Sequence, residues 1–171
     1  MELEKYNNFL TKSECEYIIE YTKNLDSYKN NTPNRNLEFY HITDYTDFKF
    51  LEDKLDSINI INKPVFNINK YKEGYYFLPH IDMGGEYDPK KERIRTVIIN
   101  LSTEDSFSGG DLYVGGDKIK YKQGKALSFY SSTVHEVTKI TKGFRYSIAL
   151  WLKKDNLKFY DPEKGPKPSL I

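Results

Sequence analysis

The spacing of apolar residues divides the chain into a first third with helical periodicity and a remainder in which apolar and polar residues alternate. Cys15 and Ile18 belong to a run at helical spacing, which predicts an amphipathic helix over about residues 12–24. Thr11 and Glu14 stand where a capping box would begin that helix, because their side chains can each accept a hydrogen bond from a free backbone N–H. We therefore interpret Cys15 as a small buried residue and not as a reactive thiol.

The next segment contains a polar stretch, a strand and a second helix. Residues 26–36 are rich in turn-forming side chains, so we expect a surface loop there, with a flap over an active site as the alternative. Residues 37–43 alternate and predict a strand. On this strand His41 has no neighbour at metal-ligand spacing, and we interpret it as a packed or half-exposed histidine. Apolar residues recur every three or four positions over about residues 45–57, which predicts a helix.

From Val65 onward, the alternation predicts many short antiparallel strands separated by Gly, Asp and Lys turns. We expect strands over residues 64–71, 74–81, 93–102, 111–114, 117–121, 125–130, 133–138 and 143–152. This pattern is typical of a sandwich or barrel, and helices that precede it are expected to pack on one sheet. We predict a single, mostly β domain, residues 1–171, with supporting elements in 1–63, a core in 64–153 and a C-terminal extension in 154–171. The extension is expected to lie extended on the surface or to be disordered.

Charge and composition narrow the class of protein. The 26 Lys and Arg residues nearly balance the 25 Asp and Glu residues, so we expect no general attraction to nucleic acid or to anionic membrane. A single cysteine excludes an internal disulfide and favours a reducing compartment. The chain has neither the roughly 18 consecutive apolar residues of a transmembrane helix nor a signal-peptide core. We expect a soluble, cytoplasmic protein of unknown oligomeric state.

His80, Asp82 and His135 are the first candidates for chemistry. Residues i and i+2 of a strand project to the same face, so the imidazole of His80 and the carboxylate of Asp82 can reach one cation. His135 is the candidate for a third ligand. Two histidines and one carboxylate form the facial triad that is typical of non-haem Fe(II) oxygenases. The alternatives are a surface ion pair for His80 and Asp82 and a loop histidine for His135.

Arg145 and Ser147 share one face of the last predicted strand. A guanidinium in this position can hold a carboxylate with two hydrogen bonds, and the hydroxyl can add another. A buried arginine without an acidic partner is costly, so such a site implies an anionic guest. The alternative is an exposed strand arginine, which the flanking Phe144 and Tyr146 allow.

Short motifs keep their order over about residues 65–153. They are Tyr71-x-x-Gly74, His80-x-Asp82, Arg93-x-x-Thr96, Asn100-Leu101-Ser102, Gly109-Gly110-Asp111-Leu112, Gly124, Phe129, His135-Glu136-Val137, Lys142-Gly143, Arg145-x-Ser147 and Trp151. In these motifs the chain resembles the Fe(II)/2-oxoglutarate-dependent dioxygenases, and in particular their prolyl 4-hydroxylase-like branch. The segment from residue 129 to residue 145 is especially similar to the bacterial PKHD-type hydroxylases.

The resemblance implies a double-stranded β-helix, which is a cupin-like jelly roll, with the N-terminal helices packed on one sheet. It assigns His80, Asp82 and His135 as Fe(II) ligands. It also assigns Arg145 as the residue that holds the distal carboxylate of 2-oxoglutarate, with Ser147 as its supporting hydroxyl.

Four further positions follow from the resemblance. Tyr71 matches a tyrosine near the co-substrate. Asn100 stands where many prolyl hydroxylases carry a tyrosine that touches the co-substrate, so this contact is expected either to be supplied by Thr96 or to be missing. Arg93 and Trp151 match positions that border the substrate cleft, and the alternatives are a solvated charge and a core aromatic.

The function that the resemblance implies is hydroxylation of an unactivated C–H bond, with 2-oxoglutarate and O2 as co-substrates and succinate and CO2 as products. A prolyl or similar residue of a protein or peptide is the expected substrate, and ascorbate dependence is also expected. The alternatives are hydroxylation of a free amino acid or small metabolite and a non-catalytic, cupin-like metal-binding module. Residues 83–92 follow the predicted ligands and are expected to be a lid or an ordinary polar connection.

Overall fold

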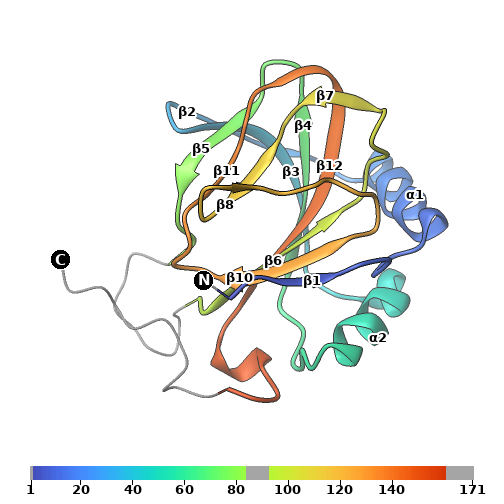
Figure 1. Cartoon of the computed structure of the whole chain (residues 1–171). Helices are drawn as coiled ribbons and strands as arrows, with labels where there is room; N and C mark the ends of the chain where they lie inside the picture. Colours follow the sequence, from blue (N-terminus) through green and yellow to red (C-terminus); the bar gives the residue numbers. More distant parts are fainter. Residues whose placement is uncertain (1, 84–92, 161–171) are drawn as a thin grey trace.

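A curled antiparallel sheet forms the body of the molecule, and two helices lie together on one side of it (Figure 1). The computed structural model describes residues 2–83 and 93–160. Its helices are α1 (Lys12–Tyr21), α2 (Lys49–Ser57) and the short 3-10 helices η1 (Thr22–Asn24), η2 (Thr46–Phe48) and η3 (Lys154–Asn156). Its strands are β1 (Glu4–Tyr6), β2 (Tyr28–Thr32), β3 (Arg35–Ile42), β4 (Phe66–Lys72), β5 (Tyr76–His80), β6 (Arg95–Asn100), β7 (Phe107–Gly109), β8 (Leu112–Val114), β9 (Asp117–Lys118), β10 (Ala126–Tyr130), β11 (His135–Val137) and β12 (Ile140–Leu152).

The strand order is β1-β10-β6-β12-β4-β3-β5-β11-β8-β9, while β2 pairs with β3 and β7 pairs with β12. The long strand β12 runs through the middle of this arrangement and pairs with both β4 and β6. The prediction of a mostly β fold with supporting N-terminal helices is confirmed.

Strand β6 is buried on both faces and separates two apolar clusters. Val97 and Ile99 point to the cluster that includes Leu51 and the other buried residues of the two helices. Ile98 points to the opposite side, into the cluster enclosed by the curled sheet. Because successive side chains of a strand alternate between faces, the same strand supports the helix layer and lines the interior.

The capping box and the burial of Cys15 are confirmed. Thr11 accepts a hydrogen bond from the backbone N–H of Glu14, and the Glu14 carboxylate accepts one from the backbone N–H of Thr11. Cys15 is fully buried, and burial raises the pKa of its thiol to about 12, so the thiol stays protonated. His41 is exposed and its Nδ1 lies 2.8 Å from Oδ1 of Asn67, away from the other two histidines.

The prediction of a surface loop over residues 26–36 is wrong. These residues form β2, a two-residue turn at Pro33 and Asn34, and the start of β3. Strand β2 lies at the edge of the sheet, and its side chains are mostly exposed, so its sequence carries no apolar alternation. The pairing of its backbone with β3 determines its conformation, and composition alone does not report that pairing.

Two smaller features, one in the predicted core and one in the C-terminal extension, differ from the prediction. Strand β7, between two predicted strands, was not expected. Leu157 forms a bridge with Ile60, so the start of the predicted C-terminal extension is fixed on the body of the protein. Residues 161–171, and the predicted lid apart from Met83, lie outside the described residues. Within residues 2–83 and 93–160, no helix is long and apolar enough to span a membrane.

Candidate metal centre

His80, Asp82 and His135 come together at the ends of two paired strands. His80 is the last residue of β5, His135 is the first residue of β11, and the two are directly opposite in the antiparallel pair. Nε2 of His80 lies 3.6 Å from Oδ1 of Asp82, and Nε2 of His135 lies 3.3 Å from Oδ2. One potential ligand atom from each residue lies within 4.8 Å of the other two, which is the spacing of a metal site.

Backbone carbonyls orient both imidazoles. Nδ1 of His80 lies 2.7 Å from the carbonyl oxygen of Leu78, and Nδ1 of His135 lies 3.0 Å from that of Thr133. A carbonyl oxygen can only accept, so we assign the proton to Nδ1 in both rings. The Nε2 atom of each ring therefore faces Asp82 and is the atom available to a metal ion.

Asp82 is held from two directions. Its backbone N–H donates to the carbonyl oxygen of Ser131 at 2.8 Å, and the hydroxyl of Thr96 donates to its Oδ2 at 2.8 Å. Burial alone would raise the pKa of Asp82, but the neighbouring His135 and the hydroxyl of Thr96 hold the pKa at about 2. The indole of Trp151 acts in the same direction, although its Nε1 does not meet hydrogen-bond geometry. The carboxylate is therefore ionised at neutral pH.

Burial, followed by the proximity of His135, lowers the pKa of His80. Its ring is thus neutral at neutral pH. The ring also stacks on Phe77 at 3.5 Å between centroids with 9° between the planes, and Phe129 meets the ring of His135 edge to face at 4.9 Å. A neutral imidazole and an ionised carboxylate are the protonation states that bind a divalent metal.

We predict that Thr96→Val weakens metal binding by about 10–100-fold without removing it, because Asp82 loses the bond that orients its carboxylate. Isothermal titration with Fe(II) or Mn(II) under anaerobic conditions measures the effect. Thr22→Val is the matched control, since the buried Thr22 hydroxyl donates to the carbonyl oxygen of Ile19, away from the cluster. Equal metal affinity in the Thr96→Val variant and the parent would remove this role from Thr96.

Arg145 projects from β12 and is only 1% exposed. Its Nε and Nη2 atoms have no hydrogen-bond partner in the described part of the chain, and no carboxylate there forms an ion pair with it. The centre of its guanidinium lies 5.6 Å from the rings of both Tyr71 and Tyr121. A buried cation without an anion is costly, so this arrangement fits an anionic ligand in the adjacent cavity.

Sequence reasoning did not identify Tyr121. It lies in the segment between β9 and β10, and its hydroxyl donates to the carbonyl oxygen of Ser102 at 2.9 Å. No local pattern singles it out from the 15 tyrosines of the chain, because only the folded sheet brings it to Arg145.

One cavity of about 50 Å³ joins the three candidate ligands to Arg145. The structure thus brings together eight of the nine predicted site residues, and the ninth, Arg93, stacks on Trp151 at 4.5 Å. The cavity is lined by Asn69, Tyr71, Phe77, His80, Asp82, Thr96, Ile98, His135, Val137, Arg145, Ser147, Ala149 and Trp151. Thr96 reaches the cavity with its hydroxyl already bonded to Asp82, and its predicted contact with a co-substrate stays a prediction.

Comparison with known families agrees with this geometry. The sequence model of the 2OG-Fe(II) oxygenase superfamily matches residues 66–153, which is half of the chain and includes the whole cavity lining. The chain belongs to the 2OG-Fe(II) oxygenase superfamily.

Curated relatives in this superfamily are PKHD-type hydroxylases. The chain is 34% identical over 103 residues to one from Cupriavidus pinatubonensis, covering 56% of this chain and 44% of the relative. It is 32% identical over 100 residues to another from Teredinibacter turnerae, covering 54% and 43%. The chain therefore spans less than half the length of these relatives.

Solved structures of prolyl hydroxylases share the fold. A Pseudomonas putida prolyl-4-hydroxylase superimposes with a TM-score of 0.69 at 15% identity, covering 88% of this chain and 91% of that chain. A Trichoplax adhaerens prolyl hydroxylase, solved with a peptide fragment of hypoxia inducible factor, has a TM-score of 0.71 at 20% identity and covers 91% and 85%. The expected double-stranded β-helix with N-terminal helices on one sheet is confirmed.

The residues of the smaller cavity fit Fe(II) and 2-oxoglutarate, the two groups that the superfamily name implies. Two imidazoles that each present Nε2 and one ionised carboxylate suit Fe(II), and they leave the side of the cluster toward the cavity open. The unpartnered guanidinium of Arg145, in the same cavity, suits the free carboxylate of 2-oxoglutarate.

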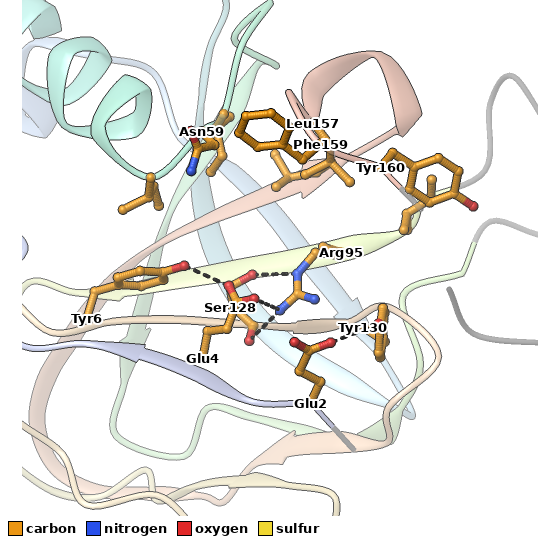
Figure 2. Close-up of a pocket in the computed structure, with 14 residues that line it drawn as sticks. Glu2, Glu4, Tyr6, Asn59, Arg95, Ser128, Tyr130, Leu157, Phe159 and Tyr160 are labelled. Carbon is orange, nitrogen blue, oxygen red and sulfur yellow. Dashed lines mark hydrogen bonds and ion pairs between the residues drawn. The ribbon is translucent and has the colours of Figure 1, made fainter. Parts of the chain in front are cut away.

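A larger cavity of about 280 Å³ lies on the opposite face of β6 (Figure 2). There the guanidinium of Arg95 donates to the Ser128 hydroxyl at 2.8 Å and pairs with Glu4 at 3.4 Å, and the Tyr6 hydroxyl donates to Glu4. These charges satisfy one another, whereas Arg145 has no such partner among the residues that the structure describes. We therefore assign the chemistry to the smaller cavity.

Gly110 makes room for Arg145. Its φ is +63°, and a Cβ there would overlap Cδ1 of Ile140 and lie 3.2 Å from Cδ of Arg145. We predict that Gly110→Ala lowers the free energy of unfolding by about 1–3 kcal/mol more than Gly116→Ala and raises the requirement for 2-oxoglutarate. Gly116 is the matched control, because its φ is +88° but a Cβ there would meet no atom within 4 Å. Urea denaturation of both variants measures the difference in the free energy of unfolding, and equal losses would contradict the predicted overlap with Ile140.

Proposed function

We propose that this protein is a dioxygenase that uses Fe(II), 2-oxoglutarate and O2 to hydroxylate an unactivated C–H bond, with succinate and CO2 as co-products. The observation that carries the proposal is the presence, in one small cavity, of a three-residue metal-ligand cluster and a buried arginine without an anion. A module that only binds metal has no use for such an arginine, which is why we place an enzyme above a cupin-like binding module.

Five residues of the cavity lining would bind iron and 2-oxoglutarate in this proposal. His80, Asp82 and His135 would hold Fe(II), which when bound supplies the activation of O2. Arg145 would bind the distal carboxylate of 2-oxoglutarate, and the buried Ser147, on the same face of β12, would add a hydrogen bond.

The surrounding side chains would position these groups and limit the access of water. Tyr71 and Tyr121 hold the guanidinium of Arg145 between them, and Thr96 orients Asp82. Phe77 and Phe129 cover the two imidazole rings. A fixed, water-poor cavity directs a reactive oxidant to the bound substrate and away from the protein.

As substrate we propose a prolyl or similar residue of a protein or peptide. The proposal is supported by the PKHD-type hydroxylases among the relatives and the prolyl hydroxylases among the solved structures. We further propose that nucleic acid and membranes are not partners, because the formal charge is only +1.

The test is succinate formation by the iron-loaded protein in air, with 2-oxoglutarate, ascorbate and a library of prolyl peptides. We expect release of succinate that requires both Fe(II) and 2-oxoglutarate, together with one oxygen atom added to a peptide residue by mass spectrometry. Ascorbate is omitted in a parallel series to test the expected dependence. Oxygen added only to free amino acids would replace the peptide substrate with a small metabolite, and no succinate above the metal-free level under any condition would contradict the enzyme.

A further inference from the structure

Arg35 and Arg93 stack on the two aromatic side chains at the sides of the metal cluster. The guanidinium carbon of Arg35 lies 5.2 Å from the ring centroid of Phe77, and that of Arg93 lies 4.5 Å from Trp151. Both aromatic rings line the smaller cavity that joins the candidate ligands to Arg145, which we call the reaction cavity. Both arginines are half-buried, and neither forms an ion pair with any acidic residue in the ranges 2–83 and 93–160.

Arg35 approaches from the β2–β3 hairpin. Its strand pairs with β5 so that Arg35 is directly opposite Phe77. One face of the Phe77 ring is covered by His80, so the guanidinium occupies the other face. The charge of Arg35 also acts on the cavity lining. Burial raises the pKa of Tyr71 to about 12, while the nearby charges of Arg145 and Arg35 act to lower it.

Arg93 approaches from the segment that enters β6. Ser131 links this segment to the cluster, since its backbone N–H donates to the carbonyl oxygen of Ile94 and its carbonyl oxygen accepts from the backbone N–H of Asp82. In the sheet, β6 and β3 are separated by β12 and β4. The two arginines therefore reach the cavity from different sides, and Figure 1 shows the β2–β3 hairpin above the end of β5 and the start of β6 below it.

The distribution of arginine in the chain is uneven. Of the cationic side chains, 22 are lysines and only four are arginines. Three of the four lie at the reaction cavity. Arg145 belongs to its lining, and Arg35 and Arg93 contact side chains of that lining. The fourth, Arg95, is paired with Glu4 on the other face of β6. Arginine differs from lysine in its planar fork, which matches a carboxylate with two hydrogen bonds and stacks on aromatic rings.

Three exposed apolar side chains lie close to candidate ligands in the sequence. Ile81, between two candidate ligands, is 48% exposed, and Val134, just before His135, is 51% exposed. Leu78, on the same strand as His80, is 44% exposed. Two guanidinium groups on the aromatic lining of one small cavity, with no acidic partner among the described residues, are cationic anchor points suited to an acidic peptide.

We propose that the substrate is a protein or peptide segment that carries carboxylate side chains on both sides of the hydroxylated residue, one for Arg35 and one for Arg93. This inference rests on the proposed function, because it identifies the ligand of the same cavity. Free proline carries a single carboxylate, so it could pair with only one of the two arginines.

The test compares three short peptides that have a central proline flanked on each side by glutamate, glutamine or lysine. We expect the iron-loaded protein to hydroxylate the glutamate peptide with a KM about 10-fold or more below that for the glutamine peptide, and to act poorly on the lysine peptide. Arg35→Gln and Arg93→Gln should each remove much of this preference by raising the KM for the glutamate peptide. Lys23→Gln, an exposed charge on η1, is the control for the change in net charge.

Other outcomes overturn the proposal. Equal use of the glutamate and glutamine peptides by the parent protein would do so. If Arg35→Gln or Arg93→Gln raised the KM for 2-oxoglutarate as much as the KM for the peptide, that arginine would only support Phe77 or Trp151. The variants Arg35→Lys and Arg93→Lys keep the charge and should retain part of the preference for the glutamate peptide. Binding of Fe(II) and 2-oxoglutarate without any preference for acidic peptides would leave the proposed function intact and remove only the acidic substrate.

Discussion

Asp82→Ala is expected to abolish turnover while the protein keeps its fold. Asp82 supplies the only carboxylate of the candidate ligand set, and both Nε2 atoms of the histidines point at it. Loss of an orienting partner of a ligand already weakens metal binding by about 10–100-fold, so loss of the ligand itself should cost more than about 100-fold. Anaerobic Fe(II) titration and succinate formation measure the two effects.

Asp53→Ala is the matched control for that variant. Asp53 is an exposed carboxylate on α2, where it pairs with Lys49, and its removal should change neither metal binding nor turnover. Circular dichroism of both variants checks that the fold is kept. Retention of parental iron affinity by Asp82→Ala would remove Asp82 from the ligand set and would leave two histidines as an incomplete site.

Arg145→Met is expected to separate the binding of 2-oxoglutarate from the binding of iron. The substitution removes a buried, charge-assisted contact with the distal carboxylate of 2-oxoglutarate. This should cost about 2–5 kcal/mol of binding free energy, which corresponds to at least about 30-fold in the apparent affinity for 2-oxoglutarate. Iron affinity should change little, because Arg145 contacts Tyr71 and Tyr121 and no candidate ligand.

The same variant should be at least as stable as the parent when no ligand is present. Nε and Nη2 of Arg145 have no partners in the described chain, so an apolar side chain of similar length relieves their burial. The parent should gain about 2.7 kcal/mol of stability from 2-oxoglutarate at about 100 times its Kd, and Arg145→Met should gain much less. Thermal unfolding with and without 2-oxoglutarate, in the presence of Mn(II), measures this.

Arg95→Met provides the opposite case. Arg95 is also buried, but its guanidinium is paired with Glu4 and Ser128, so its removal should destabilise the protein and leave the stabilisation by 2-oxoglutarate as it was. If Arg145→Met and Arg95→Met lost stability equally and both still responded to 2-oxoglutarate, the assignment of the distal carboxylate to Arg145 would be wrong.

The elements that support the site could be predicted because their local signals agree with the fold. The apolar residues of α1 and α2 recur at helical spacing, and the capping box at Thr11 and Glu14 begins the first helix where expected. At the centre of strand β6, Val97, Ile98 and Ile99 form a short apolar run, in agreement with burial of the strand on both faces. His80 and Asp82 reach one point because they are two residues apart at the end of a strand.

Other features depend on contacts between distant parts of the chain. The polar strand β2 has no apolar alternation, and only its pairing with β3 makes it a strand. Tyr121 and Phe77 are two of many aromatic residues, and their importance becomes visible only when Arg145 and His80 are found against their rings. Arg35 was placed in an expected loop, so its position beside the cavity could not be anticipated.

The most direct test of the central claim is an anaerobic titration of the protein with Fe(II) and 2-oxoglutarate, followed by the weak visible absorption band that 2-oxoglutarate gives when it chelates protein-bound Fe(II). We predict that the band appears in the parent protein, is absent in Asp82→Ala and requires a higher concentration of 2-oxoglutarate in Arg145→Met. Absence of the band in folded parent protein at saturating Fe(II) and 2-oxoglutarate would contradict the account, because the cluster and the arginine would then not form one site.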